Sequence, residues 1–73
     1  MDEGYQKLAE AIIVRAADDY RRALKTYKRN PRHKRVSAEM KELEDFFRSD
    51  WFESLSDLDG EEIMNMLCKE VLG

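Results

Sequence analysis

Apolar side chains recur at helical spacing through the first third of the chain. They fall at Tyr5, Leu8, Ala9, Ile12, Ile13, Ala16, Tyr20, Ala23, Leu24 and Tyr27. A period of about 3.6 residues held over this length predicts one long amphipathic helix, near residues 3–29. Ala9, Ala16 and Ala23 lie near the middle of the apolar stripe, where small side chains allow a second helix to approach closely. Val14 falls outside the stripe, and we expect it to be exposed.

Asn30 and Pro31 end this first helix, because the residue before a proline is disfavoured in the α conformation. The same two residues are a favoured N-cap and a favoured first helical position, so a second helix could begin at Pro31. That start would place the basic residues 32–35 at the positive end of the helix dipole, which is unfavourable. We therefore favour a loop followed by a helix from Ser37, near residues 37–48.

The next apolar positions share one helical face if the chain stays helical to residue 58. They are Val36, Met40, Leu43, Phe47, Trp51, Leu55 and Leu58. Trp51 is therefore expected to be buried. Phe46 and Phe52 do not fit this face, and on a continuous helix they would be exposed aromatics of the kind that anchor protein interfaces. Alternatively, Ser49 caps a short new helix near residues 50–56, and the bend turns the aromatic side chains into the core.

A last helix, near residues 60–72, is predicted to begin after Asp59. Asp59 is a favoured N-cap, and Glu62 stands where the second member of a capping box belongs. The apolar stripe of this helix is expected to comprise Ile63, Met66, Leu67 and Val71. Together the elements predict an all-α fold in one domain, residues 1–73, as a small bundle of three main helices and one short helix. We expect the second main helix to run antiparallel to the first and the last to pack across both.

The composition agrees with a small helical domain. The chain has 73 residues, of which 42% are apolar and 40% charged, with three Gly and one Pro. Few helix breakers and many charged residues are typical of helices. On the first helix, Arg15 is spaced to pair with Asp19, and Asp18 with Arg22. The longest apolar run, residues 11–14, is too short for a membrane span or the core of a signal peptide, so we expect a cytoplasmic protein without membrane contact.

The sequence contains no recognisable catalytic or metal-binding motif. It has no glycine-rich phosphate loop, no HExxH pattern and no nucleophile at a readable spacing from a base. Cys68 is the only cysteine and His33 the only histidine. An internal disulfide is therefore excluded, and so is a metal site built from several histidines and cysteines. We expect no enzymatic activity, no catalytic residues, no cofactor and no bound metal.

Charge is unevenly distributed along the chain. Residues 1–19 carry a net charge of −3, residues 20–35 of +8, and residues 36–73 of −8. The residues that could contact nucleic-acid phosphates or an acidic protein partner are Lys25, Lys28, Arg29, Arg32, His33, Lys34 and Arg35. We favour instead a solvated loop, in which these cations complement the negative end of the first helix's dipole. Tyr27 is the only aromatic residue among them, and the isoelectric point is near 5.1, which argues against nucleic acid as the first choice.

Several segments of the sequence carry a resemblance. They are residues 11–14 (AIIV), 19–25 (DYRRALK), 46–52 (FFRSDWF) and 57–61 (DLDGE). With them, the chain resembles short proteins of unknown function that are encoded in phages and integrative conjugative elements of Firmicutes. The resemblance covers most of the chain. It implies an all-helical protein of mobile-element origin and supplies no activity or binding residue.

These observations favour a non-enzymatic protein-interaction module, an accessory protein of a mobile element. We expect its partner to be another protein and expect a monomer rather than a homodimer. Phe46 and Phe52 are possible interface residues, although we favour the bend at Ser49 that buries them, because so small a domain needs its large side chains in the core. The alternative function is nucleic-acid binding through the basic segment 25–35.

Overall fold

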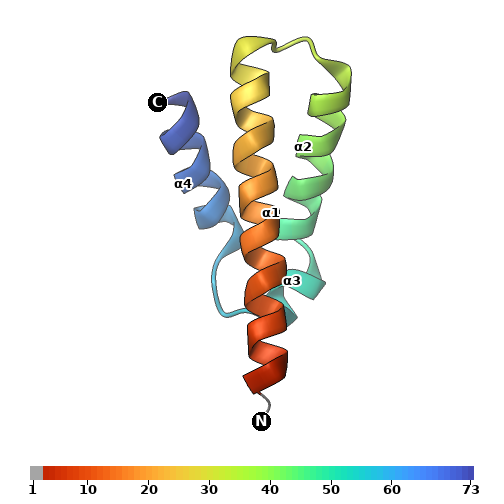
Figure 1. The fold of residues 1–73 in the computed structure, drawn as a ribbon, viewed down its shortest axis with the longest axis vertical. Helices are drawn as coiled ribbons and strands as arrows, with labels where there is room; N and C mark the ends of the chain where they lie inside the picture. Colours follow the sequence, from red (N-terminus) through yellow and green to blue (C-terminus); the bar gives the residue numbers. More distant parts are fainter. Residues whose placement is uncertain (1–2) are drawn as a thin grey trace.

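Four helices follow one another along the chain in the computed structural model, which describes residues 3–73. They are α1 (Glu3–Arg29), α2 (Lys34–Phe47), α3 (Asp50–Leu55) and α4 (Gly60–Leu72). The fold is all-α, without a strand among residues 3–73. α1 runs the length of the molecule, α2 returns antiparallel beside it, and α4 runs beside α1 in the same direction as α1 (Figure 1). α1 makes the main contacts with both α2 and α4, while α2 and α4 touch each other less.

The central alanines of α1 lie in the core as expected. Ala9, Ala16 and Ala23 are buried, and Tyr20 and Leu24 beside them are almost fully buried. Val14 is exposed, as expected from its place outside the stripe, whereas Leu8, which fits the stripe, is also exposed. The side chains of residues 3, 5 and 6 lie outside the described residues, so the place of Tyr5 stays a prediction.

α2 begins three residues earlier than predicted, at Lys34 rather than Ser37. Its N-cap is His33, whose ring atom Nδ1 accepts a hydrogen bond from the backbone N–H of Val36 at 3.3 Å. An imidazole nitrogen can therefore take the place of the usual cap oxygen. The cations that follow His33 are exposed, and solvent reduces their repulsion from the helix dipole. The repulsion is therefore too weak to delay the start of α2 to Ser37.

The chain bends between α2 and α3 at Ser49. The hydroxyl of Ser49 donates a hydrogen bond to the carbonyl of Phe46 at 2.6 Å and accepts one from the backbone N–H of Phe52 at 3.1 Å. It therefore links the end of α2 to the start of α3. The bend buries Phe52 completely and Phe46 partly. The favoured expectation, a bend at Ser49 that turns Phe52 into the core, is therefore confirmed, and the alternative of Phe52 as an interface residue is wrong because it has no exposed surface.

Trp51 lies on the outer side of this bend and is more than half exposed, so the expectation that it is buried is also wrong. A helix places successive side chains about 100° apart, and a turn that directs Phe52 inward directs Trp51 outward. The Trp51 indole packs edge-on against the ring of Phe46, with centroids 5.5 Å apart.

α4 begins after Asp59, whose carboxylate accepts a hydrogen bond from the N–H of Glu61 at 2.9 Å, as a cap residue does. Its buried face differs from the predicted one. Met64, Leu67 and Val71 are buried, whereas Met66 is the most exposed of the large apolar residues. The helix is therefore rotated about its axis relative to the periodicity prediction. At the start of the helix, Gly60 packs directly against the backbone of Phe47 at the end of α2.

The ion pairs of α1 also differ from those predicted. Arg21 pairs with Asp18 at 2.8 Å and with Glu70 of α4 at 2.6 Å, while Arg22 approaches Asp19 at 3.8 Å. The predicted i,i+4 pairs are replaced by i,i+3 pairs, because α4 lies along this side of α1 and brings Glu70 to Arg21.

Candidate functional site

α1 is longer than its neighbours, and this leaves part of its apolar stripe without a helix on it. With 27 residues at a rise of 1.5 Å it is about 40 Å long, whereas α2 and α4, with 14 and 13 residues, are each about 20 Å long. α2 and α4 flank the C-terminal half of α1. The N-terminal half extends beyond them towards α3 and the loop that follows it (Figure 1).

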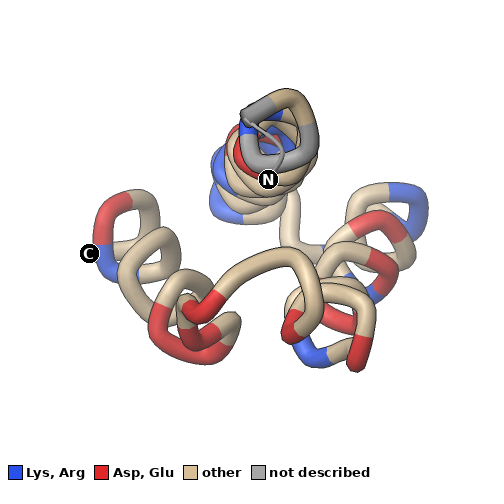
Figure 2. Tube along the Cα trace, turned by 90° about the horizontal axis from the view of Figure 1, so that it is seen from below, with Lys and Arg blue, Asp and Glu red and all other residues tan. Residues whose placement is uncertain are grey.

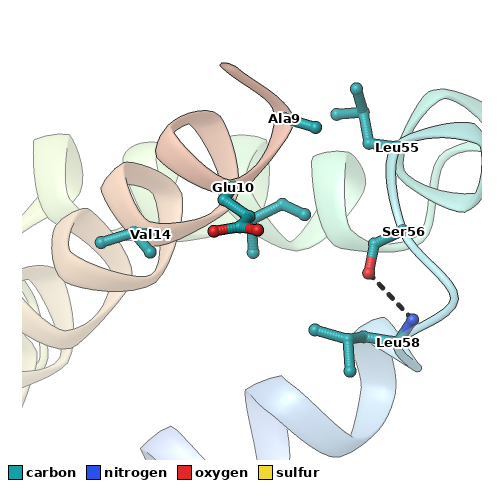
Figure 3. A pocket seen from close by; sticks show the side chains of 7 residues that line it. Ala9, Glu10, Val14, Leu55, Ser56 and Leu58 are labelled. Atoms are coloured by element: carbon teal, nitrogen blue, oxygen red, sulfur yellow. Dashed lines mark hydrogen bonds between the residues drawn. The ribbon is translucent and has the colours of Figure 1, made fainter. Parts of the chain in front are cut away.

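An open groove of about 400 Å³ lies along this N-terminal half of α1. We call it the α1–α3 groove. Its lining residues are Ala9, Glu10, Ile13 and Val14 of α1, Leu55 of α3, and Ser56 and Leu58 of the loop. Figure 3 shows Leu55 and Leu58 on one side of the groove and the α1 residues on the other. The groove is apolar apart from the carboxylate of Glu10 and the hydroxyl of Ser56.

A local hydrogen bond sets the loop wall of the groove. The hydroxyl of Ser56 accepts a hydrogen bond from the backbone N–H of Leu58 at 3.0 Å, as drawn in Figure 3. This turn holds the side chain of Leu58 at the surface, where it is 58% exposed. An exposed leucine contributes nothing to the core, and it leaves apolar surface for a partner to cover.

A smaller hollow of about 260 Å³ lies between α1 and α2. Its lining residues are Ile12, Arg15, Ala16, Asp19, Leu43, Phe46 and Trp51. Of the two aromatic residues proposed as interface contacts, only Phe46 reaches this surface. Trp51, which was expected in the core, takes the exposed position instead.

The basic residues gather at the opposite end of the molecule. We call residues 25–35 the basic end, which comprises the last turns of α1, the connecting turn and the start of α2 (Figure 1). The exposed side chains are Lys25, Lys28, Arg29, Arg32, Lys34 and Arg35, while His33 is half-buried. Two of the seven candidates have structural contacts: His33 caps α2, and the Nζ of Lys28 donates a hydrogen bond to the carbonyl of Val71 at 3.1 Å.

A partly buried polar cluster joins α1, α2 and α4 around Tyr20. The Tyr20 hydroxyl donates a hydrogen bond to the Glu44 carboxylate at 2.8 Å and lies 3.8 Å from the Sγ of Cys68. Burial and the hydrogen bond to Glu44 raise the pKa of Tyr20 well above its usual value, so the phenol stays neutral. The cluster therefore acts as a structural link between α1, α2 and α4.

Within residues 3–73, no three His, Cys, Asp or Glu side chains are grouped so that they could hold a metal ion. None of the four helices combines the length and the apolar character needed to cross a membrane. No protein-family model matches the sequence, and comparison with curated proteins and with solved structures also finds no match.

The basic end could be recognised in the sequence because its basic residues lie close together along the chain. The α1–α3 groove was not, because Leu55 and Leu58 fit the same periodicity as the core residues before them. The length of the first helix was the signal that could have indicated it. A helix near residues 3–29 is about twice as long as the helices predicted to pack on it, so part of its stripe must lack a helical neighbour.

Proposed function

We propose that this chain is a non-enzymatic protein-interaction module that binds a segment of another protein in the α1–α3 groove. The observation that supports this most directly is the groove itself, with the exposed leucine Leu58 held at its edge by Ser56. Apolar surface of this kind marks interaction sites in small proteins. The resemblance of the sequence further supports a role as an accessory protein of a mobile element, acting in the cytoplasm.

A second copy of the chain is a poor occupant of this groove. In a symmetric dimer the same surface contributes from both subunits. The acidic residues that follow α3, such as Asp57 and Asp59, would then lie close to the acidic residues of the second copy. Like charges brought together across an interface repel one another. This repulsion supports a monomer that binds a different protein.

The test uses a pair of matched surface variants. Leu58→Asn removes an exposed apolar side chain inside the groove, and Met66→Asn removes one of similar exposure on α4, which does not line the groove. The wild-type protein and both variants are used as baits in a lysate of the host cell, and bound proteins are quantified by mass spectrometry. We expect a protein that is retained by wild type and Met66→Asn and lost by Leu58→Asn. Identical sets of proteins on all three baits would contradict the proposal.

Nucleic-acid binding is the second candidate function. Six exposed cations at one end of an elongated molecule support it, since phosphate contacts need closely placed lysines and arginines. Against it stands the absence, within residues 25–35, of any aromatic residue but Tyr27 on which a base could stack.

Gel mobility shift with a generic DNA or RNA fragment at low salt tests this second function. The variant Lys25→Ala/Arg29→Ala/Arg32→Ala/Arg35→Ala leaves Lys28 and His33, which make structural contacts, in place. If the basic end binds phosphates, this variant weakens binding and reduces the slope of log affinity against log salt by about one for each contact removed. No shift of either protein at low salt would exclude the function.

A further inference from the structure

We infer that the segment bound in the α1–α3 groove is a basic amphipathic helix, with an apolar ridge flanked by lysine and arginine. The inference rests on the proposed function, because it concerns the chemistry of the partner at the same groove. It derives from the charged residues that neighbour the groove residues in the chain, most of which are acidic, with Lys7 and Arg15 of α1 as exceptions.

Residues 50–62 form one stretch of chain that is rich in acidic residues and that we call the acidic end. Its six acids are Asp50, Glu53, Asp57, Asp59, Glu61 and Glu62, and the sequence has no Lys or Arg from Ser49 to Cys68. Figure 2 shows Asp and Glu along the loop between α3 and α4 and at the start of α4. Two of the groove residues, Leu55 and Leu58, come from this same stretch. The apolar groove residues Leu55 and Leu58 are therefore close in the chain to several carboxylates.

Few of these carboxylates are neutralised within the protein. Of the ion pairs among residues 3–73, one uses an acid of the acidic end, the pair of Glu61 with Arg48. Asp59 is occupied as the N-cap of α4. On the α1 wall, Glu10 lines the groove, and the nearest cation along the helix is Lys7, one turn earlier. A partner with cations beside its apolar side chains would meet mainly negative charge.

The shape of the groove favours a helix over an extended strand. A strand binds by adding to the edge of a sheet, and residues 3–73 contain no strand that could accept one. The groove instead has the side of α1 as one wall, and a second helix packs against such a wall with side chains at i, i+3, i+4 and i+7. Lys and Arg beside this ridge would reach Glu10 and Asp57.

Selection from an unbiased library tests the inference. A displayed library of random 16-residue peptides is selected on the full-length protein and counter-selected on the Leu58→Asn variant, with Met66→Asn as the matched control surface. We expect the enriched peptides to carry a net positive charge and apolar residues at helical spacing. They should bind the Met66→Asn variant as well as they bind wild type, and bind Leu58→Asn about tenfold more weakly.

The outcomes separate the two proposals. Peptides that depend on Leu58 but are neutral or acidic would overturn the inference about charge and leave the groove as a docking site. A selection that yields no peptide dependent on Leu58 would overturn both. Peptides that bind equally to Leu58→Asn and wild type and depend only on charge would also overturn both, because such binding does not use the groove.

Charge variants test the electrostatic part separately. Glu10→Gln and Asp57→Asn each remove one carboxylate beside the groove, and Glu42→Gln removes an exposed one on α2. For an enriched peptide we expect affinity to fall roughly threefold with each of the first two variants, to stay unchanged with the control, and to fall as salt is raised. An equal effect of all three variants, or no effect of any, would contradict direct pairing of the peptide with the groove.

Discussion

At the scale of single residues, Gly60 makes the contact on which the orientation of α4 depends. A β-carbon placed on Gly60 would lie 2.0 Å from the carbonyl oxygen of Phe47 and 2.8 Å from its carbonyl carbon. Both atoms belong to the backbone at the end of α2, which cannot move aside as a flexible side chain can. Glycine is therefore required here by the close approach of two backbones.

Gly60→Ala is expected to destabilise the protein by about 2 kcal/mol, because the added methyl group forces α2 and α4 apart. Gly4 is the matched control, since a β-carbon there meets no atom within 4 Å. Gly4→Ala should instead stabilise the protein slightly, by about 0.5 kcal/mol, because alanine favours helix more than glycine does. Urea unfolding of both variants measures the difference. Equal stabilities would show that Gly60 does not define the packing of α4.

Tyr20 predicts a dependence of stability on alkaline pH. Burial, and next the hydrogen bond to Glu44, raise its pKa in the folded protein, so the folded state keeps the phenolic proton after the unfolded state has lost it. The stabilisation is complete below the ordinary tyrosine pKa of about 10 and is lost as the pH rises further, at up to about 1.4 kcal/mol per pH unit.

The variant Tyr20→Phe isolates this effect, because all other titrating groups are shared with wild type. At pH 9 we expect the variant to be less stable by about 1 kcal/mol, since it lacks the hydrogen bond to Glu44. Between pH 9 and pH 11 its free energy of unfolding should fall less steeply than that of wild type. Parallel pH profiles of the two proteins would contradict a buried, neutral Tyr20.

At the scale of the helices, the caps decide where each element begins. Ser49 and Asp59 cap α3 and α4 with side-chain oxygens, whereas α2 uses the imidazole of His33 at a longer distance, 3.3 Å. The α2 cap also precedes the cations Lys34 and Arg35, in the turn where the helix dipole favours acids. The start of α2 is therefore the least favourable of the three.

Replacement of His33 tests this cap. His33→Asp supplies a carboxylate that accepts the Val36 N–H and attracts the neighbouring cations, so we expect a gain of about 0.5 to 1 kcal/mol in the free energy of unfolding. His33→Ala removes the acceptor and should cost a similar amount. Thermal melts of the two variants, followed by circular dichroism, measure the effect. Identical melting temperatures would mean that the ring nitrogen does not stabilise the helix.

The sequence predicted features that depend on neighbouring residues and missed those that depend on distant ones. The end of α1 before Pro31 and the caps Ser49 and Asp59 are local, and the structure confirms them. The exposure of Trp51 follows from the local bend at Ser49, which one helical period carried through residues 36–58 leaves out. The exposure of Met66 depends on how α4 packs against α1 and α2, which are distant in the sequence. For the same reason the basic end was found and the α1–α3 groove was not.

At the scale of the whole molecule, the basic end and the acidic end are separate regions. The protein measures 44 × 22 × 17 Å, with residues 25–35 at one end of its long axis and the first turns of α1 at the other, while α3 lies beside the N-terminal half of α1 (Figure 1). Residues 25–35 contain no Asp or Glu, and residues 50–62 contain no Lys or Arg. Within each region, like charges therefore lie close together along the chain and repel one another.

Stability should consequently rise with salt. Between about 0.01 M and 0.15 M sodium chloride, screening weakens the repulsion within each end, and we expect the free energy of unfolding to increase by up to about 1 kcal/mol. Urea unfolding at a series of salt concentrations measures this change. A fall in stability over the same range would show that attractions such as the pair of Arg21 with Glu70 outweigh the repulsions.

The unequal lengths of the helices have a consequence for cooperativity. The C-terminal half of α1 shares its unfolding with α2 and α4, because Tyr20, Leu24 and Lys28 connect it to them. Residues 7–14 have few such connections, and local opening costs little where buried contacts are few. Amide hydrogen exchange should therefore be slow in the C-terminal half of α1 and fast in its N-terminal part. We expect the change to fall between Tyr20 and Ala9. A segment bound in the groove would slow amide exchange in the N-terminal part of α1. Binding would then lengthen the part of α1 that unfolds together with α2 and α4.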